Sequence, residues 1–138
     1  MILNKYTALK SKQQAEVDAF PFGFAFNKDQ FDEMMANWGL KPTNRSQIIY
    51  IGEGCHIRKS DYKAMHEMFD RHEAERKEAM QDDEYLYWMF NYELGNHEYS
   101  YTQDLTDTLE ALGLTIDEIN ADPRMADALK RAIAAQED

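Results

Sequence analysis

Several features that mark particular classes of protein are missing from this sequence. It has one cysteine, Cys55, so no disulfide can form within the chain, which suits a reducing cytoplasm. It has no run of about eighteen apolar residues, so we expect no membrane-spanning helix. The first residues carry lysines but no apolar run, so we expect no signal peptide. These absences predict a cytoplasmic protein.

The sequence also lacks the common motifs of enzymes. Residues 52–54 (GEG) do not have the third glycine of a dinucleotide-binding fingerprint, and no serine lies in a nucleophile-elbow context. Cys55 and His56 are neighbours in an expected strand, so their side chains should point to opposite faces and not form a catalytic pair. We therefore expect a protein that is not an enzyme and that needs no cofactor.

Basic residues are missing from a long part of the chain. The net charge is −11, and Lys77 and Arg124 enclose a stretch without lysine or arginine that holds twelve acidic residues. Residues 1–60 contain eight basic and six acidic residues, a net of +2, whereas residues 61–138 contain seven and twenty, a net of −13. This charge opposes direct binding to nucleic acid or to an anionic membrane, and it favours a basic protein surface as partner.

The apolar content is high enough for a packed core, at 43% of residues, with 12% aromatic. Helix and strand periodicities predict an α+β fold: one helix-rich domain over residues 1–138, with about five to six helices. A small antiparallel sheet of two or three strands is expected in the N-terminal half. The expected strands are 22–26, 47–51 and 55–58. The expected helices are 8–19, 28–38, 61–80, 84–95, one that starts at 102 or 104 and ends at 112, and a last pair after residues 115 and 123.

Capping signals support these boundaries. Asn27 with Gln30, and Thr115 with Glu118, have the spacing of a capping box. Ser60 is the expected N-cap of the long third helix, and Pro123 fits the first turn of the last helix.

Acidic and aromatic residues are interspersed between residues 84 and 110. The aromatic residues could form a core beneath a wet acidic surface, or they could anchor a protein-binding face. The helix 84–95 is aromatic almost all round, so it is either central in the fold or buried between the subunits of a homo-oligomer. The residues expected to bind a partner are Glu84, Tyr85, Trp88, Glu93, Glu98, Tyr99, Tyr101, Asp104, Asp107 and Glu110.

An alternative interpretation is a metal-dependent enzyme. His66, Asp70 and Glu73 recur at helical spacing and could share one face, with His97 as a further ligand. The glutamate-to-histidine spacing of three residues found in helical di-iron sites is absent, and so is the zinc motif of metalloproteases. An exposed, charged helix face explains the same residues without a metal.

The chain resembles a group of small proteins carried by bacteriophages and mobile elements of gut bacteria. The resemblance covers about residues 20–135, and its distinctive strings are 24–31 (FAFNKDQF), 51–58 (IGEGCHIR), 70–78 (DRHEAERKE), 96–104 (NHEYSYTQD) and 112–114 (LGL). This group is linked to anti-CRISPR proteins that inhibit type II RNA-guided nucleases.

The resemblance implies stoichiometric binding in a host bacterial cell rather than turnover. The partner would be a nuclease whose guide–DNA channel is strongly basic. We therefore expect a non-catalytic acidic inhibitor that occupies a basic nucleic-acid groove and does not bind nucleic acid itself.

Overall fold

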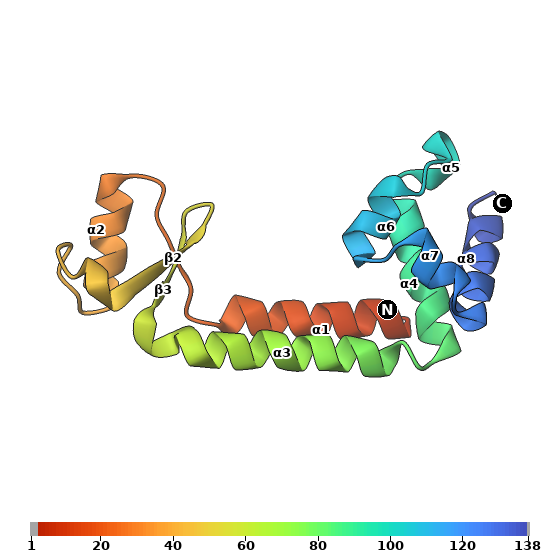
Figure 1. The fold of residues 1–138 in the computed structure, drawn as a ribbon. Coiled ribbons are helices and arrows are strands. Elements are labelled where there is room, and N and C mark those ends of the chain that lie inside the picture. Colours follow the sequence, from red (N-terminus) through yellow and green to blue (C-terminus); the bar gives the residue numbers. More distant parts are fainter. Residues whose placement is uncertain (1–2, 138) are drawn as a thin grey trace. The chain divides into compact units, whose positions relative to one another are not determined.

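A computed structural model describes residues 3–137, and over these residues it contains eight α-helices and a three-stranded antiparallel sheet (Figure 1). The predicted helix-rich α+β class is therefore confirmed. The chain divides into two compact units: unit 1 comprises residues 1–14 and 74–138, and unit 2 comprises residues 15–73. The boundaries fall inside α1 (Lys5–Ala19) and inside α3 (Tyr62–Ala79). Whether the units act as one domain stays a prediction.

Unit 2 contains the sheet, whose strand order is β1-β3-β2. The hairpin of β2 (Ile48–Gly52) and β3 (Cys55–Arg58) pairs Tyr50 with His56. Its turn has three positive φ angles, 122° at Gly52, 52° at Glu53 and 77° at Gly54, and glycine adopts such angles at little cost. The strand predicted at residues 22–26 is reduced to β1 (Gly23–Phe24), because only this part pairs with β3.

Helix α2 (Lys28–Asn37) packs directly onto β1. The Asn27 side chain accepts a hydrogen bond from the Gln30 backbone N–H at 2.8 Å, which confirms the predicted N-cap. A Cβ on Gly23 would lie 2.6 Å from Met34 Sδ and from the Trp38 ring, so this close approach requires glycine. The cluster beneath α2 consists of Ala25, Phe31, Met34 and Met35.

The start of α3 differs from the prediction. A 3₁₀ turn covers Lys59–Asp61, so Ser60 lies within that turn and is not the N-cap of the long helix. The buried residues of α3 are Met65, Met68 and His72, whereas Tyr62 and Phe69 are each 42% exposed.

Unit 1 is built around α4 (Asp83–Asn96), which packs on α8 (Pro123–Gln136). Asp82 caps α4 by accepting hydrogen bonds from two backbone N–H groups. Alanines 128 and 132 of α8 are fully buried, and their small size lets the two helices approach closely. The core cluster is Tyr6, Tyr85, Leu86, Met89, Phe90, Leu94, Ile119, Ala128, Leu129 and Ala132.

Three short helices connect α4 to α8: α5 (Tyr99–Thr102), α6 (Thr106–Leu112) and α7 (Ile116–Asn120). The predicted Thr115–Glu118 capping box at α7 is confirmed. Helix α5 was not predicted. It is flanked by Glu98 and Gln103, whose φ angles of 56° and 54° lie in the left-handed region. Among residues 3–137 no helix combines the length and apolarity that a membrane crossing requires.

Candidate partner-binding surface

The aromatic helix α4 is a core element of unit 1. Phe90 and Leu94 are completely buried, and Tyr85 is 3% exposed. Of the two interpretations of this helix, the structure of unit 1 favours the central position in the fold. Tyr85 was wrongly predicted to contact a partner, because its side chain is packed inside unit 1. Trp88, at 36% exposed, retains some accessible surface.

Glu93 was also wrongly predicted as a partner-binding residue. It is 4% exposed, and the Tyr6 hydroxyl donates a hydrogen bond of 2.8 Å to its Oε1. Lys10 Nζ lies 3.8 Å from the same oxygen, and His97 Nε2 lies 3.4 Å from Oε2. Burial and the hydrogen bond to Glu93 raise the pKa of the Tyr6 hydroxyl. Glu93 thus links α1 to α4 inside unit 1, and this role makes it a structural residue.

The sequence could show the Glu93–His97 pair, because the two residues lie one helical turn apart. It could not show Tyr6, which is 87 positions away in the chain. Tyr6 and Lys10 are one turn apart on α1, and the Lys10 ammonium also lies 5.7 Å from the Tyr92 ring. These contacts explain why the helix starts at Lys5 rather than at residue 8 as predicted.

The acidic segment, residues 98–118, contains six acidic residues and no basic one. Within the described part of the chain, none of these carboxylates lies within ion-pair distance of a Lys, Arg or His side chain. All six are exposed, and they are Glu98, Asp104, Asp107, Glu110, Asp117 and Glu118. Four of the predicted acidic partner-binding residues therefore lie together in one uncompensated stretch of chain.

The acidic segment also has a defined local structure. The Asp104 side chain accepts a hydrogen bond of 2.8 Å from the Thr106 backbone N–H, which opens α6. Hydrogen bonds from Thr106 hold the pKa of the Asp104 carboxyl below its ordinary value, so this group is ionised at neutral pH. Tyr101, in α5, is 92% exposed, whereas Tyr99 packs partly against the core of unit 1.

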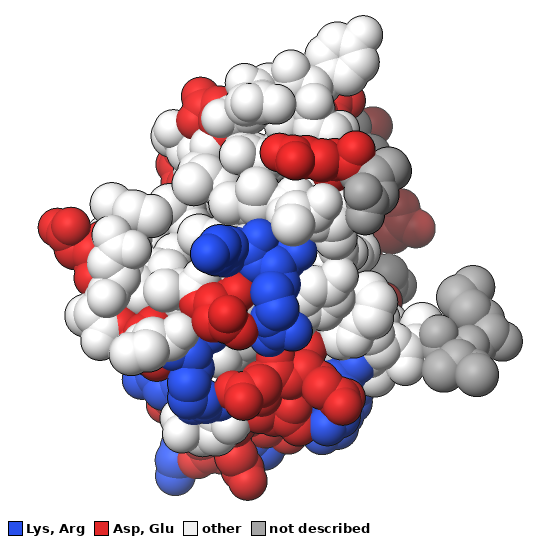
Figure 2. Space-filling view, turned by 90° about the vertical axis from the view of Figure 1, so that its right-hand side faces the viewer, with Lys and Arg blue, Asp and Glu red and all other residues white. Residues whose placement is uncertain are grey.

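Glu84, the first predicted partner-binding residue, lies in a different electrostatic environment. Lys5 Nζ is 3.6 Å from its Oε2 and also pairs with Asp82. Arg124 Nε pairs with Asp83 Oδ1 at 2.6 Å. Figure 2 shows basic side chains lying among the acidic ones on one face of the molecule. The negative charge of residues 78–122 is therefore partly compensated near the start of α4, and uncompensated in the acidic segment.

The alternative metal site is not assembled. Among residues 3–137, the ligand atoms of His66, Asp70 and Glu73 do not come within 4.8 Å of one another. The His66 ring instead packs edge-on against Tyr62, with centroids 4.4 Å apart. His97 belongs to unit 1, where it pairs with Glu93. His66, Asp70 and Glu73 therefore do not form the predicted shared metal site on α3.

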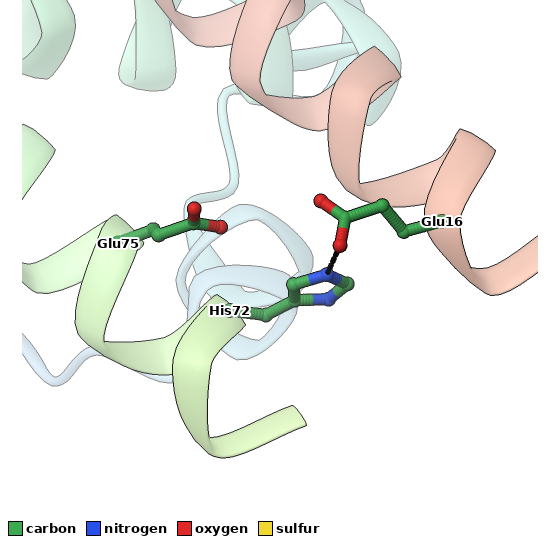
Figure 3. A group of neighbouring side chains, drawn as sticks. All are labelled: Glu16, His72 and Glu75. Atoms are coloured by element: carbon green, nitrogen blue, oxygen red, sulfur yellow. Dashed lines mark ion pairs between the residues drawn. The ribbon is translucent and has the colours of Figure 1, made fainter. Parts of the chain in front are cut away.

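A different histidine forms a polar contact in unit 2. Figure 3 shows Glu16 of α1 facing the buried His72 of α3, with 3.5 Å between Glu16 Oε2 and His72 Nε2. Arg71 also donates hydrogen bonds to the Glu16 carboxylate. These bonds, chiefly from Arg71, lower the pKa of Glu16 to about 2. Glu75, also drawn, belongs to unit 1, where Lys12 Nζ lies 2.9 Å from its Oε2.

The Glu16 contact gives a testable titration. We expect the Glu16 carboxyl to titrate near pH 2 in the folded protein rather than near its ordinary value of 4.5. Because the folded pKa is lowered, the contact stabilises the fold above the ordinary pKa and is lost as the pH falls towards 2. Carboxyl ¹³C NMR measures the value directly. In Arg71→Gln it should rise towards 4.5, and an unchanged value there would contradict the assignment to Arg71.

The fold and these contacts define a small α+β protein with a buried glutamate network in unit 1 and an exposed acidic segment beside it. Residues 5–135 match the model of a family of unknown function, DUF7659, so the chain belongs to that family. The match includes parts of both units. No curated protein and no solved structure matches the chain significantly.

Proposed function

We propose that the protein is a non-catalytic acidic binding protein that docks its acidic segment onto a basic, nucleic-acid-binding groove of another protein. The observation that carries this proposal is the set of six exposed carboxylates in residues 98–118 that have no basic partner among the described residues. Near the start of α4, by contrast, Lys5 and Arg124 pair with acidic residues. A segment left uncompensated is a suitable counterpart for a basic surface.

Tyr101 supplies an apolar contact within the same segment. A tyrosine that is 92% exposed contributes nothing to the core, and tyrosine is one of the residues that most often anchor protein interfaces. The left-handed residues on either side of α5 hold Tyr101 in a short, turned segment rather than in a regular helix. The acidic residues would then determine how the protein is oriented on its partner and how fast the two associate. Tyr101 would add to the area buried in the interface.

The basic partner that the sequence resemblance supports is a nuclease of a host defence system, of the type II RNA-guided class. Such an enzyme holds nucleic acid in a positively charged channel, and an acidic protein in that channel would exclude the substrate. Inhibition would then be stoichiometric, reversible by salt and independent of any catalytic residue in this chain.

Charge reversal in the acidic segment tests the proposal. We expect Asp104→Lys, Asp107→Lys and Glu110→Lys together to weaken binding to a type II RNA-guided nuclease by at least about a hundredfold, because like charges would meet across the interface. Binding is measured by surface plasmon resonance, and inhibition by cleavage of a target DNA. The affinity of the unmodified protein should fall as salt rises from about 0.15 M, where the Debye length is about 8 Å, towards 1 M.

The matched control variant changes the net charge by the same amount, but at residues outside the acidic segment. Glu33, Glu67 and Asp70 are exposed acidic residues of unit 2, and replacing all three with lysine should leave binding within about threefold of the unmodified protein. If both triple variants bind equally well, or if neither the protein nor the control inhibits the nuclease, the proposal is wrong.

A further inference from the structure

A pocket in unit 2 has a composition opposite to that of the acidic segment. It has a volume of about 650 Å³ and lies between the start of α2 and the β2–β3 hairpin. Of the charged residues that line it, two are basic, Lys28 and Arg45, and one is acidic, Asp32. Aromatic side chains also line the pocket. The pocket is thus locally basic and aromatic in a protein that is acidic as a whole.

Two aromatic side chains at this pocket are strongly exposed. Phe26 is 73% exposed and Tyr50 is 61% exposed, although both are large and apolar enough to be buried. Gly54 holds both in place: the Phe26 ring lies where a Gly54 Cβ would be, and the Gly54 N–H donates a hydrogen bond of 3.3 Å to the Tyr50 hydroxyl. These rings are therefore positioned by the hairpin turn while their faces stay accessible.

Two further aromatic rings, His56 and Phe31, and the Arg45 guanidinium also line the pocket. The Tyr50 and His56 rings have centroids 5.0 Å apart, and those of His56 and Phe31 are 5.6 Å apart. The Arg45 guanidinium carbon lies 4.6 Å from the centroid of Phe31. Arg45 is exposed, and this stacking fixes its plane beside the pocket while leaving N–H donors for a ligand. Lys28 Nζ, 3.7 Å from Asp32, adds a second cation at the start of α2.

We propose that this pocket binds a nucleotide, with the planar base stacked on Phe26 or Tyr50 and the phosphate held by Arg45 and Lys28. A purely apolar ligand would make no use of the N–H donors of Arg45 and Lys28, and a simple anion would leave both exposed rings in water. A nucleotide satisfies both sets of groups, because a base stacks on aromatic rings and a phosphate takes paired N–H donors from arginine.

The net charge of −11 does not prevent this binding. At physiological salt, exposed charges more than about 8 Å apart are largely screened from one another, so the groups lining the pocket dominate the field there. The proposal concerns one nucleotide, either free or within a short single strand. Long nucleic acid would be repelled by the rest of the acidic surface. It is independent of the proposed function, which rests on residues of unit 1.

The test titrates the full chain with the four ribonucleoside 5′-monophosphates and, separately, with a uridine trinucleotide. Backbone amide NMR should show shifts at pocket residues such as Gly54 and His56. We expect Phe26→Ala and Arg45→Gln each to weaken binding by about tenfold, as loss of one base–aromatic stack or one charged hydrogen bond does. Tighter binding of the trinucleotide would identify a single strand as the source, and equal binding would identify a free nucleotide.

Matched controls separate ligand contacts from general effects. Phe24→Ala removes a neighbouring ring that is 60% exposed but lies outside the pocket, and Lys59→Gln removes an exposed cation elsewhere in unit 2. Both should bind as the unmodified protein does. The proposal is overturned if no nucleotide causes shifts at millimolar concentration, or if the pocket variants and the controls bind alike. Unchanged amide spectra of the free variants establish that each one is folded.

Discussion

Replacing Phe90 with alanine is expected to lower the free energy of unfolding by about 4 kcal/mol, the largest effect of any single change considered for unit 1. Phe90 is completely buried in the middle of α4, and the other residues of its core cluster are fixed on α1, α4, α7 and α8. Truncation removes a whole ring and leaves a cavity that these helices cannot fill by a small shift. Urea denaturation followed by circular dichroism measures the loss.

The control for this change is Tyr101→Ala, which removes a ring that is 92% exposed. Its expected effect on stability is below about 0.5 kcal/mol, as for other surface substitutions. The same experiment tests the homo-oligomer interpretation of the aromatic helix. If α4 were buried between subunits, stability would depend on protein concentration. A Phe90→Ala effect below about 1 kcal/mol would show that α4 is not a core helix.

Glu93→Ala is expected to lower the free energy of unfolding by about 3 kcal/mol. The carboxylate is buried and accepts the Tyr6 hydrogen bond, so its removal leaves the Tyr6 hydroxyl without its acceptor and Lys10 without its counter-ion. Glu98→Ala is the matched control, since that glutamate is exposed and makes no ion pair among the described residues, and it should change stability by less than about 0.5 kcal/mol.

A double-mutant cycle isolates the contact that we consider decisive. Tyr6→Phe combined with Glu93→Ala should show a coupling energy of about 1 kcal/mol or more. The Tyr6 pKa is raised in the folded state, so its contribution is complete below the ordinary value of 10.0 and is lost as pH rises above it. Stability should therefore fall more steeply above pH 10 in the unmodified protein than in Tyr6→Phe. The Tyr6–Glu93 contact would be contradicted if the two single mutations had additive effects on stability and if stability fell equally steeply above pH 10 in the unmodified protein and in Tyr6→Phe.

Local signals in the sequence predicted much of the secondary structure. The Asn27 cap and the Thr115–Glu118 capping box involve residues three positions apart, so their hydrogen bonds follow from the chain itself. The β2–β3 hairpin follows from a β-branched run and a glycine turn. The short helix α5 escaped prediction because left-handed residues other than glycine start and end it, and no local preference marks them.

The candidate sites were predicted only in part. The acidic segment was found because a missing residue type is visible in any sequence, and four of its six acids were among the predicted partner-binding residues. Tyr85 and Glu93 were wrongly included, since helical periodicity cannot separate a buried from an exposed face when almost every position is aromatic. The pocket of unit 2 was missed because Phe26, Arg45 and Tyr50 come from three separate segments of the chain.

The sequence alone determined the helix-rich α+β class, most helix boundaries and the uneven distribution of charge, because these depend on residue type and on contacts within a few positions. The tertiary structure alone decided which acids are compensated. Lys5 reaches Asp82 and Glu84, Arg124 reaches Asp83, and Tyr6 reaches Glu93, each across more than forty residues of chain. The acidic segment is left without basic partners, since no basic side chain of the described residues packs within ion-pair distance of it.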